Sequence, residues 1–191
     1  MDEEYATQIK VPQDRVAVII GTQGKSKAEI EEATGCRLSI NSEENIVAII
    51  GEDPLKVYTV QQIVKAIARG FNPKKALLLI KADYVLEIIE LRLLVKKEHM
   101  KRVKGRIIGE EGKSRALIEE HTDSFVSVYG KTVSIIGRPE GASLAKHAIL
   151  NLIKGSPHAN VYKWLEKKHS ELKARELISD DFIKEEYRDG H

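Results

Sequence analysis

The sequence predicts an α+β fold in which one small domain occurs twice in tandem, and three observations support this prediction. Shifting the 191-residue chain by 88 positions lays residues 16–40 over residues 104–128, and 12 of the 25 pairs are identical. Both segments contain a Gly-x-x-Gly loop between two helical patterns. Each copy then continues into two short runs of β type and a helical pattern that ends at a glycine, Gly70 or Gly155. A period near 88 residues is too long for a solenoid, so the pattern indicates a duplicated domain.

The expected elements follow the same order in both copies. Proline near the start of each closing helix and glycine after its end are typical helix boundaries. Gly130-Lys131 predicts a tight hairpin turn in the second copy, whereas residues 41–45 form a longer, acidic loop in the first. In the first copy we expect a leading strand at 6–11, an apolar segment at 15–20, an amphipathic helix at 25–34, strands at 37–40 and 46–50, and a closing helix at 54–69. In the second copy we expect a leading strand at 85–93, for which a helix is the alternative, an apolar segment at 102–108, an amphipathic helix at 113–122, strands at 125–129 and 132–136, and a closing helix at 139–154.

Two further segments complete the chain. Asn72-Pro73 favours a short helix at 74–81, whose leucines are expected to pack against one or both domains. A long, charged helix is expected at 161–178, with a frayed tail beyond Ser179. Because no Gly/Ser-rich linker separates the copies and each is small enough to be marginally stable alone, we expect them to pack together. The predicted domains are 1–71 and 84–156, with a linker at 72–83 and the C-terminal helix and tail at 157–191.

The composition excludes several classes of protein. The 31 basic and 29 acidic residues give a net charge of +2, so the total charge identifies no partner. The single cysteine, Cys36, excludes an internal disulfide and a cysteine-based zinc cluster, and is expected in the core. No apolar run approaches the roughly 18 residues of a membrane helix, and the acidic start of the chain is unlike a signal peptide. The sequence therefore predicts a cytoplasmic protein without membrane contact, metal or cofactor.

Positive charge gathers around the two glycine loops. Residues 96–115 hold eight basic and three acidic side chains, and residues 10–27 hold four basic and one acidic. Glycine at both ends of a loop permits positive φ and lets another backbone approach without a Cβ in the way. The helix that follows presents unpaired N–H groups and the positive end of its dipole at the same point. The combination is typical of a site for a sugar-phosphate backbone, whereas the charge alone would fit a solvated surface.

A nucleotide-binding P-loop is a rival interpretation, because the Gly-Lys-Ser sequences at 24–26 and 112–114 resemble its end. The P-loop motif needs another glycine five positions before this one. Ile19 and Ile107 occupy those positions. The turn that would cradle a nucleotide's phosphates is therefore missing from both copies.

The runs Ile-Ile-Gly-x-x-Gly-Lys-Ser at 19–26 and 107–114 resemble the KH domain, which binds single-stranded nucleic acid and clamps four nucleotides with its Gly-x-x-Gly loop. The resemblance implies two tandem type I KH domains, each a three-stranded antiparallel sheet packed on three helices, plus a C-terminal helix. Residues 101–113, 127–133 and 155–158 further resemble the Partner-of-Nob family of archaea and eukaryotes, over nearly the whole chain. That resemblance implies a non-enzymatic RNA-binding adaptor in ribosome biogenesis. The implied partners are the 3′ region of small-subunit (16S) rRNA and a PIN-domain endonuclease, or another ribosome-assembly protein.

The second copy is predicted to be the main RNA clamp, and the first a helper or a protein-docking module. Glu110 and Glu111 repel phosphate, but the surrounding cations outnumber them; in the first copy, Glu43 and Glu44 lie in the hairpin loop that borders the groove. The predicted RNA-binding residues of the second copy are Gly109, Glu110, Glu111, Gly112, Lys113, Arg115, Lys104, Gly105, Arg106, Ile107, Ile108, Val126 and Val128. Those of the first copy are Gly21, Thr22, Gln23, Gly24, Lys25, Lys27, Ile19, Ile20, Leu38 and Ile40.

The predicted residues are expected to contact different parts of the RNA. The loop N–H groups, with Lys104, Arg106, Lys113 and Arg115, would hold phosphates, and the apolar residues would form a floor for the bases. With three phenylalanines and one tryptophan in the chain, aromatic stacking is not the main source of affinity.

Other classes of function stay open from the residues alone. The glutamate pairs 31–32 and 119–120 could serve a metal-dependent nuclease, but a solvated helix face is the favoured interpretation. The histidines do not have the spacing of metal ligands, and His121 and His147 are expected on helix surfaces. The alternative to rRNA processing is a general KH RNA-binding protein or a protein-docking scaffold in RNA processing or translation. Trp164, which a scaffold would use for docking, is expected instead to cap the core of the second domain.

Overall fold

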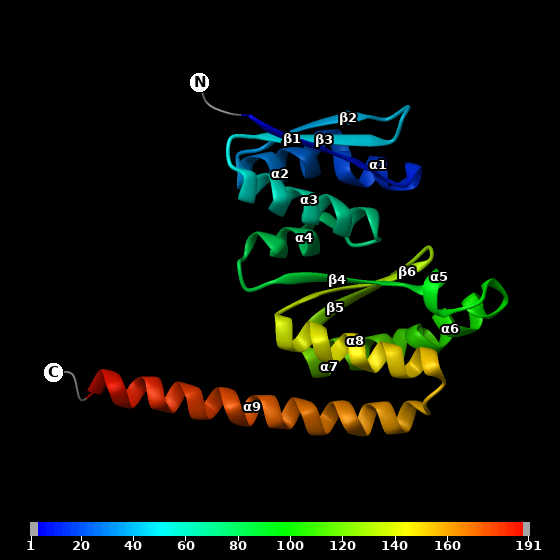
Figure 1. Ribbon diagram of the computed structural model, residues 1–191, viewed down its shortest axis with the longest axis vertical. Helices are drawn as coiled ribbons and strands as arrows, with labels where there is room; N and C mark the ends of the chain where they lie inside the picture. Colours follow the sequence, from blue (N-terminus) through cyan, green and yellow to red (C-terminus); the bar gives the residue numbers. More distant parts are fainter. Residues whose placement is uncertain (1–3, 189–191) are drawn as a thin grey trace.

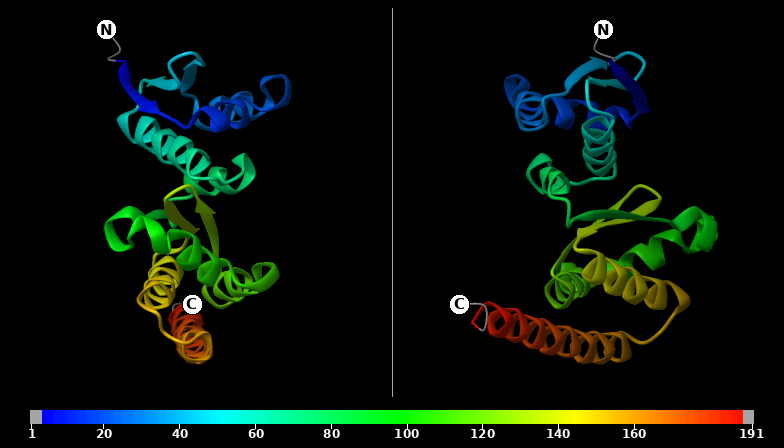
Figure 2. Two further views of the ribbon diagram at one scale, coloured as in Figure 1. Left: turned by 90° about the vertical axis from the view of Figure 1, so that its right-hand side faces the viewer. Right: turned by 60° about the vertical axis from the view of Figure 1, so that its left-hand side comes forward.

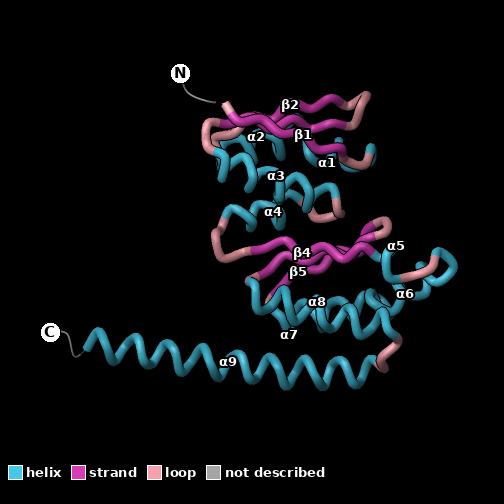
Figure 3. Tube along the Cα trace, viewed as in Figure 1, coloured by secondary structure: helices cyan, strands magenta, loops and turns pink. Residues whose placement is uncertain are grey.

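The structure, a computed structural model, describes the backbone of residues 4–188 and the side chains of residues 4–175. Figures 1 and 3 show two successive α+β units followed by one long helix. The first unit contains β1 (Tyr5–Lys10), α1 (Gln13–Ile20), the 3-10 turn η1 (Thr22–Gly24), α2 (Lys25–Thr34), β2 (Arg37–Asn41), β3 (Ile46–Gly51), α3 (Pro54–Ala68), α4 (Pro73–Ala76) and the 3-10 turn η2 (Leu77–Ile80). The second contains β4 (Val85–Glu90), α5 (Leu91–Leu94), η3 (Lys97–His99), α6 (Met100–Ile108), η4 (Glu110–Gly112), α7 (Lys113–Thr122), β5 (Ser124–Tyr129), β6 (Thr132–Gly137) and α8 (Pro139–Lys154); α9 (His158–Arg188) follows.

Each unit folds a three-stranded antiparallel sheet onto its helices. The strand orders are β1-β3-β2 and β4-β6-β5, so the last strand of each unit lies in the centre and pairs with both others. The registers correspond as well, with Ile9 opposite Val47 in the first sheet and Ile89 opposite Val133 in the second. The predicted fold class, with two such units and a C-terminal helix, is confirmed.

Two predicted segments differ from the structure in the type of element that they form, beyond shifts of a few residues at the ends of others. The strand expected at 85–93 ends at Glu90, where its pairing with β6 ends opposite Thr132, and the one-turn helix α5 begins at the next residue. The helix expected at 74–81 consists of α4 followed by the 3-10 turn η2. Its leucines pack against the core of the first unit.

The sheet of the second unit is covered on both faces. Side chains alternate along a strand, so Val133 and Ile135 of β6 face the helices of their own unit, while Ile136 belongs to the core of the first unit. All six residues of β6 are buried, whereas buried and half-buried residues alternate along β3. Leu86 and Phe125 lie on the same outer face and also pack against the first core. The expected packing of the two copies is therefore confirmed.

The helices of the first unit cover this outer face of the second sheet, and Figure 2 shows the resulting stack of sheet, helices, sheet and helices. Gly70, which follows α3 and has φ +100°, lies directly against β5. A Cβ at this position would lie 2.6 Å from the Oγ of Ser127 and 2.7 Å from the Cβ of Tyr129. Glycine is therefore needed here both for its backbone conformation and for the close approach of the two units.

Polar contacts fix the two units in one arrangement. The Ser127 hydroxyl donates to the carbonyl oxygen of Arg69 at 3.0 Å, and Arg69 pairs with Glu90 at 3.3 Å. The Tyr129 hydroxyl donates to a carboxylate oxygen of Asp14. Burial, together with this hydrogen bond, raises the pKa of Tyr129 above its ordinary value, so the phenol stays protonated.

The long helix α9 packs across α7 and α8 on the far side of the second unit. Its Val161 and Leu165 are buried in the second core, and Trp164, half-buried against that core, stacks on His147 with ring centroids 5.2 Å apart. The expectation that Trp164 caps this core is confirmed. The helix begins at His158 and continues to Arg188, so it is longer than the predicted 161–178; a frayed tail beyond Ser179 stays a prediction, and residues 189–191 lie outside the described residues.

Candidate nucleic-acid interface

The first glycine of each Gly-x-x-Gly loop serves the fold. Gly109 ends α6 with φ 75° and ψ 175°, a backbone region that is essentially restricted to glycine. A Cβ there would lie 2.6 Å from both the Cβ and the backbone nitrogen of Ser114. Gly21 has φ 74° and ψ 174°, and its Cβ would lie 2.3 Å from the Oγ of Ser26. The loop therefore packs so closely against the following helix that no other residue fits at this position.

The second glycine of each loop is open to its surroundings. Gly112 has φ 81° and Gly24 has φ 78°, both in the left-handed region, and a Cβ at either position would meet no described atom within 4 Å. No described side chain caps α7 or α2, so the N–H groups of their first turns are not satisfied by a capping residue. An anionic group can approach the backbone here, next to the positive end of the helix dipole.

Exposed cations flank the opening of the second loop. Lys113 and Arg115, on the first turn of α7, lie 3.9 Å from the carboxylates of Glu111 and Glu119, respectively. Exposed pairs at such distances contribute little, so both cations are available to a phosphate. Lys104 instead donates to the carbonyl oxygen of Gly130 at 3.2 Å and ties α6 to the β5–β6 hairpin.

The phosphate contact expected of Arg106 is not the contact that its side chain makes. Its Nε donates to the carbonyl oxygen of Leu152 at 3.2 Å, and its Nη2 to that of Ser156 at 2.6 Å. These carbonyls belong to the end of α8 and the turn after it, and that of Leu152 also accepts a hydrogen bond from the backbone N–H of Gly155 at 3.1 Å. The ring of His158, in turn, lies 2.8 Å from the carbonyl oxygen of Arg106 itself. Arg106 and His158 thus join the base of the glycine loop to the α8–α9 turn.

In the first unit, an arginine at a different position of the repeat makes the hydrogen bonds that Arg106 makes in the second. Arg15 donates to the carbonyl oxygens of Ile67 and Phe71, at 2.7 and 2.5 Å, which correspond to those of Leu152 and Ser156 when the closing helices are aligned. In the 88-residue alignment, however, Arg15 falls opposite Val103, so no repeated arginine signals this contact. Sequence reasoning missed Arg15 for that reason. It missed the role of His158, which belongs to the 155–158 motif, because the contact joins residues 52 positions apart.

The residues of the predicted apolar floor fall into two sets by burial. Four of its residues are fully packed inside the two cores, because they occupy the inward positions of their helix or strand: Ile19, Leu38, Ile107 and Val126. Four are half-buried, and we call them the rim residues: Ile20, Ile40, Ile108 and Val128. Only the second set offers surface to a base.

The glutamate pairs on α2 and α7 do not form carboxylate pairs for a metal. Glu31 accepts a hydrogen bond from the backbone N–H of Leu38 at 2.7 Å, and Glu119 accepts one from Val126 at 2.6 Å. The expectation of a fully solvated face is therefore wrong for Glu31 and Glu119, which hold the start of β2 and β5. Among the described residues, no group of three or more His, Cys, Asp or Glu side chains could hold a metal ion.

The remaining singled-out residues lie where the sequence predicted. Cys36 is 3% exposed in the first core, and burial raises the pKa of its thiol. His121 and His147 lie on the surfaces of α7 and α8, with the carbonyl oxygen of His121 2.8 Å from the His169 ring. Within the described residues, no helix is both long and apolar enough to span a membrane.

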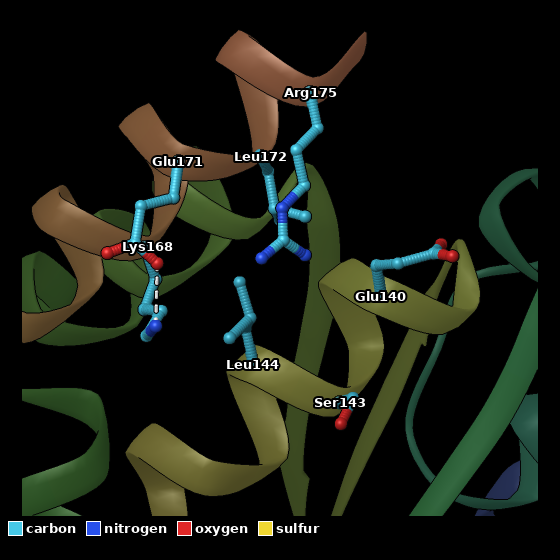
Figure 4. A pocket seen from close by; sticks show the side chains of 7 residues that line it. All are labelled: Glu140, Ser143, Leu144, Lys168, Glu171, Leu172 and Arg175. Carbon is cyan, nitrogen blue, oxygen red and sulfur yellow. Dashed lines mark hydrogen bonds and ion pairs between the residues drawn. The ribbon is translucent and has the colours of Figure 1, made fainter. Parts of the chain in front are cut away.

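Two hollows in the structure lie away from the glycine loops. One, of about 910 Å³, lies where α7 ends, α8 begins and α9 passes. The other, of about 220 Å³, lies between α8 and α9, where Figure 4 shows the Arg175 guanidinium pointing between Leu172 and Leu144. None of the predicted RNA-binding residues lines either hollow, and the length of α7 separates its end from the loop by about 15 Å.

The chain contains two copies of a three-stranded sheet packed on helices, and each copy has a Gly-x-x-Gly loop between two helices. These features define a protein of the tandem KH class. A family model described as the eukaryotic-type KH domain (KH-domain type I) matches residues 85–170, and a KH-domain model matches residues 6–66. The KH domain-containing protein MJ0443 of Methanocaldococcus jannaschii is 44% identical over 170 residues, which cover 86% of this chain and 74% of that protein.

Two further relatives narrow the class to a family. The pre-rRNA-processing protein pno1 of Aspergillus fumigatus is 36% identical over 119 residues, 60% of this chain and 47% of that protein, so the match spans about half of the fungal protein. A chain in the crystal structure of the a/eIF2alpha–aDim2p–rRNA complex from Pyrococcus horikoshii is 44% identical, with a TM-score of 0.84 over 88% of this chain and 96% of that chain. The chain belongs to the PNO1 (Dim2) family of tandem KH proteins.

Proposed function

We propose that this protein is a single-stranded RNA-binding adaptor in ribosome biogenesis, which binds near the 3′ end of small-subunit rRNA and assists its maturation. The RNA strand passes over Gly112, where the backbone is bare, and its phosphates meet the first-turn N–H groups of α7 together with Lys113 and Arg115. The bases turn toward the half-buried rim residues Ile108 and Val128.

The observation that carries this proposal is the open corner at Gly112, combined with exposed cations on the same turn. An adaptor needs such a surface and no reactive group, and the described glutamates of α7 are engaged in the fold or exposed singly. Family membership adds support, because relatives are named as pre-rRNA-processing proteins and one solved relative is in complex with rRNA.

Fluorescence anisotropy with labelled single-stranded RNA tests the proposal. One RNA carries the 3′-terminal sequence of the small-subunit rRNA, and its control has the same composition in scrambled order. We expect tighter binding of the rRNA sequence, with an affinity that falls as salt rises because phosphate contacts release counterions. Equal affinity for both RNAs would leave a general RNA-binding protein, and no binding would refute the proposal.

The partner in processing is a PIN-domain endonuclease, and the chain itself is not an enzyme and acts in the cytoplasm. Addition of this protein to a purified endonuclease of that class should raise the rate or accuracy of cleavage at the rRNA 3′ end. The variant Gly112→Asp is the control, since it should abolish the effect without altering the nuclease. Cleavage by this protein alone in magnesium or manganese would contradict the adaptor role.

A further inference from the structure

The two units differ at one connection, between the leading strand and the helix that ends in the glycine loop. Val11 and Leu91 are equivalent, because each is buried and donates its backbone N–H, at 2.9 Å, to the equivalent residue of the hairpin, Asn45 or Lys131. In the first unit α1 begins almost at once, at Gln13. In the second unit, residues 92–99 intervene before α6, and we call this segment with Lys101 and Arg102 the spur.

The spur is held in a defined conformation. The helical turn of α5 is closed by a hydrogen bond from the N–H of Val95 to the carbonyl oxygen of Leu91 at 2.8 Å, and that of η3 by one from His99 to Lys96 at 3.0 Å. Leu91 is fully buried in the second core, and Val95 packs against that core. Beyond η3, Met100 packs against the same core and Val103 is buried in it, so the backbone of the spur is anchored at both ends and its exposed side chains project from it.

The projecting side chains are basic or apolar. Leu93 and Leu94 are 77% and 53% exposed. Five exposed cations accompany them, against the single exposed acid of the segment, Glu98: Arg92, Lys96, Lys97, Lys101 and Arg102. Arg92 pairs with Glu90 at 3.3 Å, but the other four form no ion pair within the described part of the chain. The first unit has Gln13 and Asp14 where the second has Lys101 and Arg102, so this surface belongs to the second unit alone.

The spur continues the candidate interface. Figures 1 and 3 place α5 beside the β5–β6 hairpin, in agreement with the hydrogen bond from Leu91 to Lys131. Lys104 ties α6 to the same hairpin turn. The nine residues of α6 separate residues 92–99 of the spur from the glycine loop by about 14 Å, and Lys101 and Arg102 lie on the first turn of that helix. An extended strand that leaves the loop along α6 therefore reaches the spur within a few nucleotides.

We propose that the spur is a second RNA-contact surface, which holds nucleotides flanking those clamped by the loop at residues 109–112. The inference rests on the proposed function. Cations without an ion-pair partner on an anchored backbone complement phosphates. Leu93 and Leu94 provide an apolar surface for the faces of single-stranded nucleobases. An acidic protein helix is the other class of ligand with matching chemistry, but continuity with the glycine loop favours RNA.

Full-length protein titrated with two single-stranded RNAs tests this inference. The short RNA has about six nucleotides, enough for the four that a KH loop clamps, and the long RNA has about fourteen, so that it extends past the spur. The charge variant is Lys96→Gln with Lys97→Gln, and the apolar variant is Leu93→Ser with Leu94→Ser. The matched control is Lys163→Gln with Lys167→Gln, two exposed lysines on α9.

We expect the charge variant to lose about fivefold to tenfold in affinity for the long RNA and nothing for the short one. Its salt slope for the long RNA should fall by about 1.4, which is about 0.7 for each of two lost phosphate contacts. Unchanged affinity for the long RNA, or an equal loss for both lengths, would overturn the inference. If the charge variant loses affinity for the long RNA and the apolar variant does not, the role proposed for Leu93 and Leu94 would be refuted. Failure of the wild-type protein to bind either RNA would instead refute the proposed function.

Discussion

Replacement of Gly112 by aspartate tests the candidate interface most directly. The position is open, so the new Cβ meets no described atom within 4 Å, and the cost to folding is the left-handed backbone alone. That cost is about 1–2 kcal/mol for an L-residue, and aspartate tolerates the region better than most. Gly24→Asp is a matched control, because Gly24 has nearly the same φ and the same open surroundings in the first unit. Both variants should therefore remain folded, with similar losses of stability.

The effect on RNA binding follows from the charge that the variant introduces. A carboxylate about 5 Å from a phosphate is repelled by about 0.8 kcal/mol at the dielectric constant of water and by about 3 kcal/mol at an effective value of 20. Since about 1.4 kcal/mol is a factor of ten, repulsion alone predicts a loss of roughly fourfold to more than a hundredfold. The side chain also obstructs the approach of the sugar-phosphate backbone. We therefore expect at least a tenfold loss for Gly112→Asp.

Fluorescence anisotropy with labelled single-stranded RNA measures this loss, and circular dichroism confirms that each variant is folded. A folded Gly112→Asp protein that binds RNA as tightly as the wild type would refute the contact. The ranking of the two units rests on the comparison with Gly24→Asp, which should lose less. A larger loss for Gly24→Asp would make the first unit the main clamp.

Four further predictions follow from the same geometry. Gly109→Ala should cost about 3 kcal/mol or more in urea denaturation and Gly112→Ala about 1–2 kcal/mol, because only the former meets Ser114 and occupies a glycine-only backbone region; equal costs would contradict the packing argument. Arg106→Ala should destabilise the protein by about 2–4 kcal/mol, since it removes two charge-assisted bonds to helix-end carbonyls; a loss of RNA affinity with unchanged stability would restore Arg106 to the phosphate site. Tyr129→Phe should lower the free energy of unfolding by about 1 kcal/mol at pH 7. Because the folded state raises the pKa of Tyr129, that contribution is present below about pH 10 and is lost as the pH rises through the raised value, so urea titrations of the two proteins should converge in alkali. Finally, purified protein with Mg²⁺ or Mn²⁺ should leave labelled RNA intact, and reproducible cleavage would show a catalytic site where the described residues form no metal cluster.

The asymmetry of the stack explains why the two units need not act alike. The outer face of the second sheet is covered by the first unit, and the helices of the second unit are covered by α9, so the second unit is enclosed on two sides. The hairpin turn at Gly130 is held by Lys104, and the neighbouring Tyr129 by Asp14 of the first unit. The first unit thus supports the β5–β6 hairpin of the second unit.

Local patterns in the chain were sufficient to predict the elements and their order. The helices at 25–34, 113–122 and 139–154 have the predicted bounds, because periodicity, proline and glycine act through neighbouring residues only. The repeated glycines likewise revealed the two loops, and a resemblance in the same residues identified the family. Each of these signals lies within a few positions along the chain.

Contacts between distant residues, by contrast, could not be read in this way. Arg106 has the charge of a phosphate ligand, and only the position of the α8–α9 turn shows that its guanidinium is already bound there. Gly109 and Gly112 look alike in the motif, yet Ser114 lies against the first and open space against the second. Which polar or apolar group is free for RNA depends on what the folded chain places within a few ångströms of it, and that is a property of three-dimensional packing.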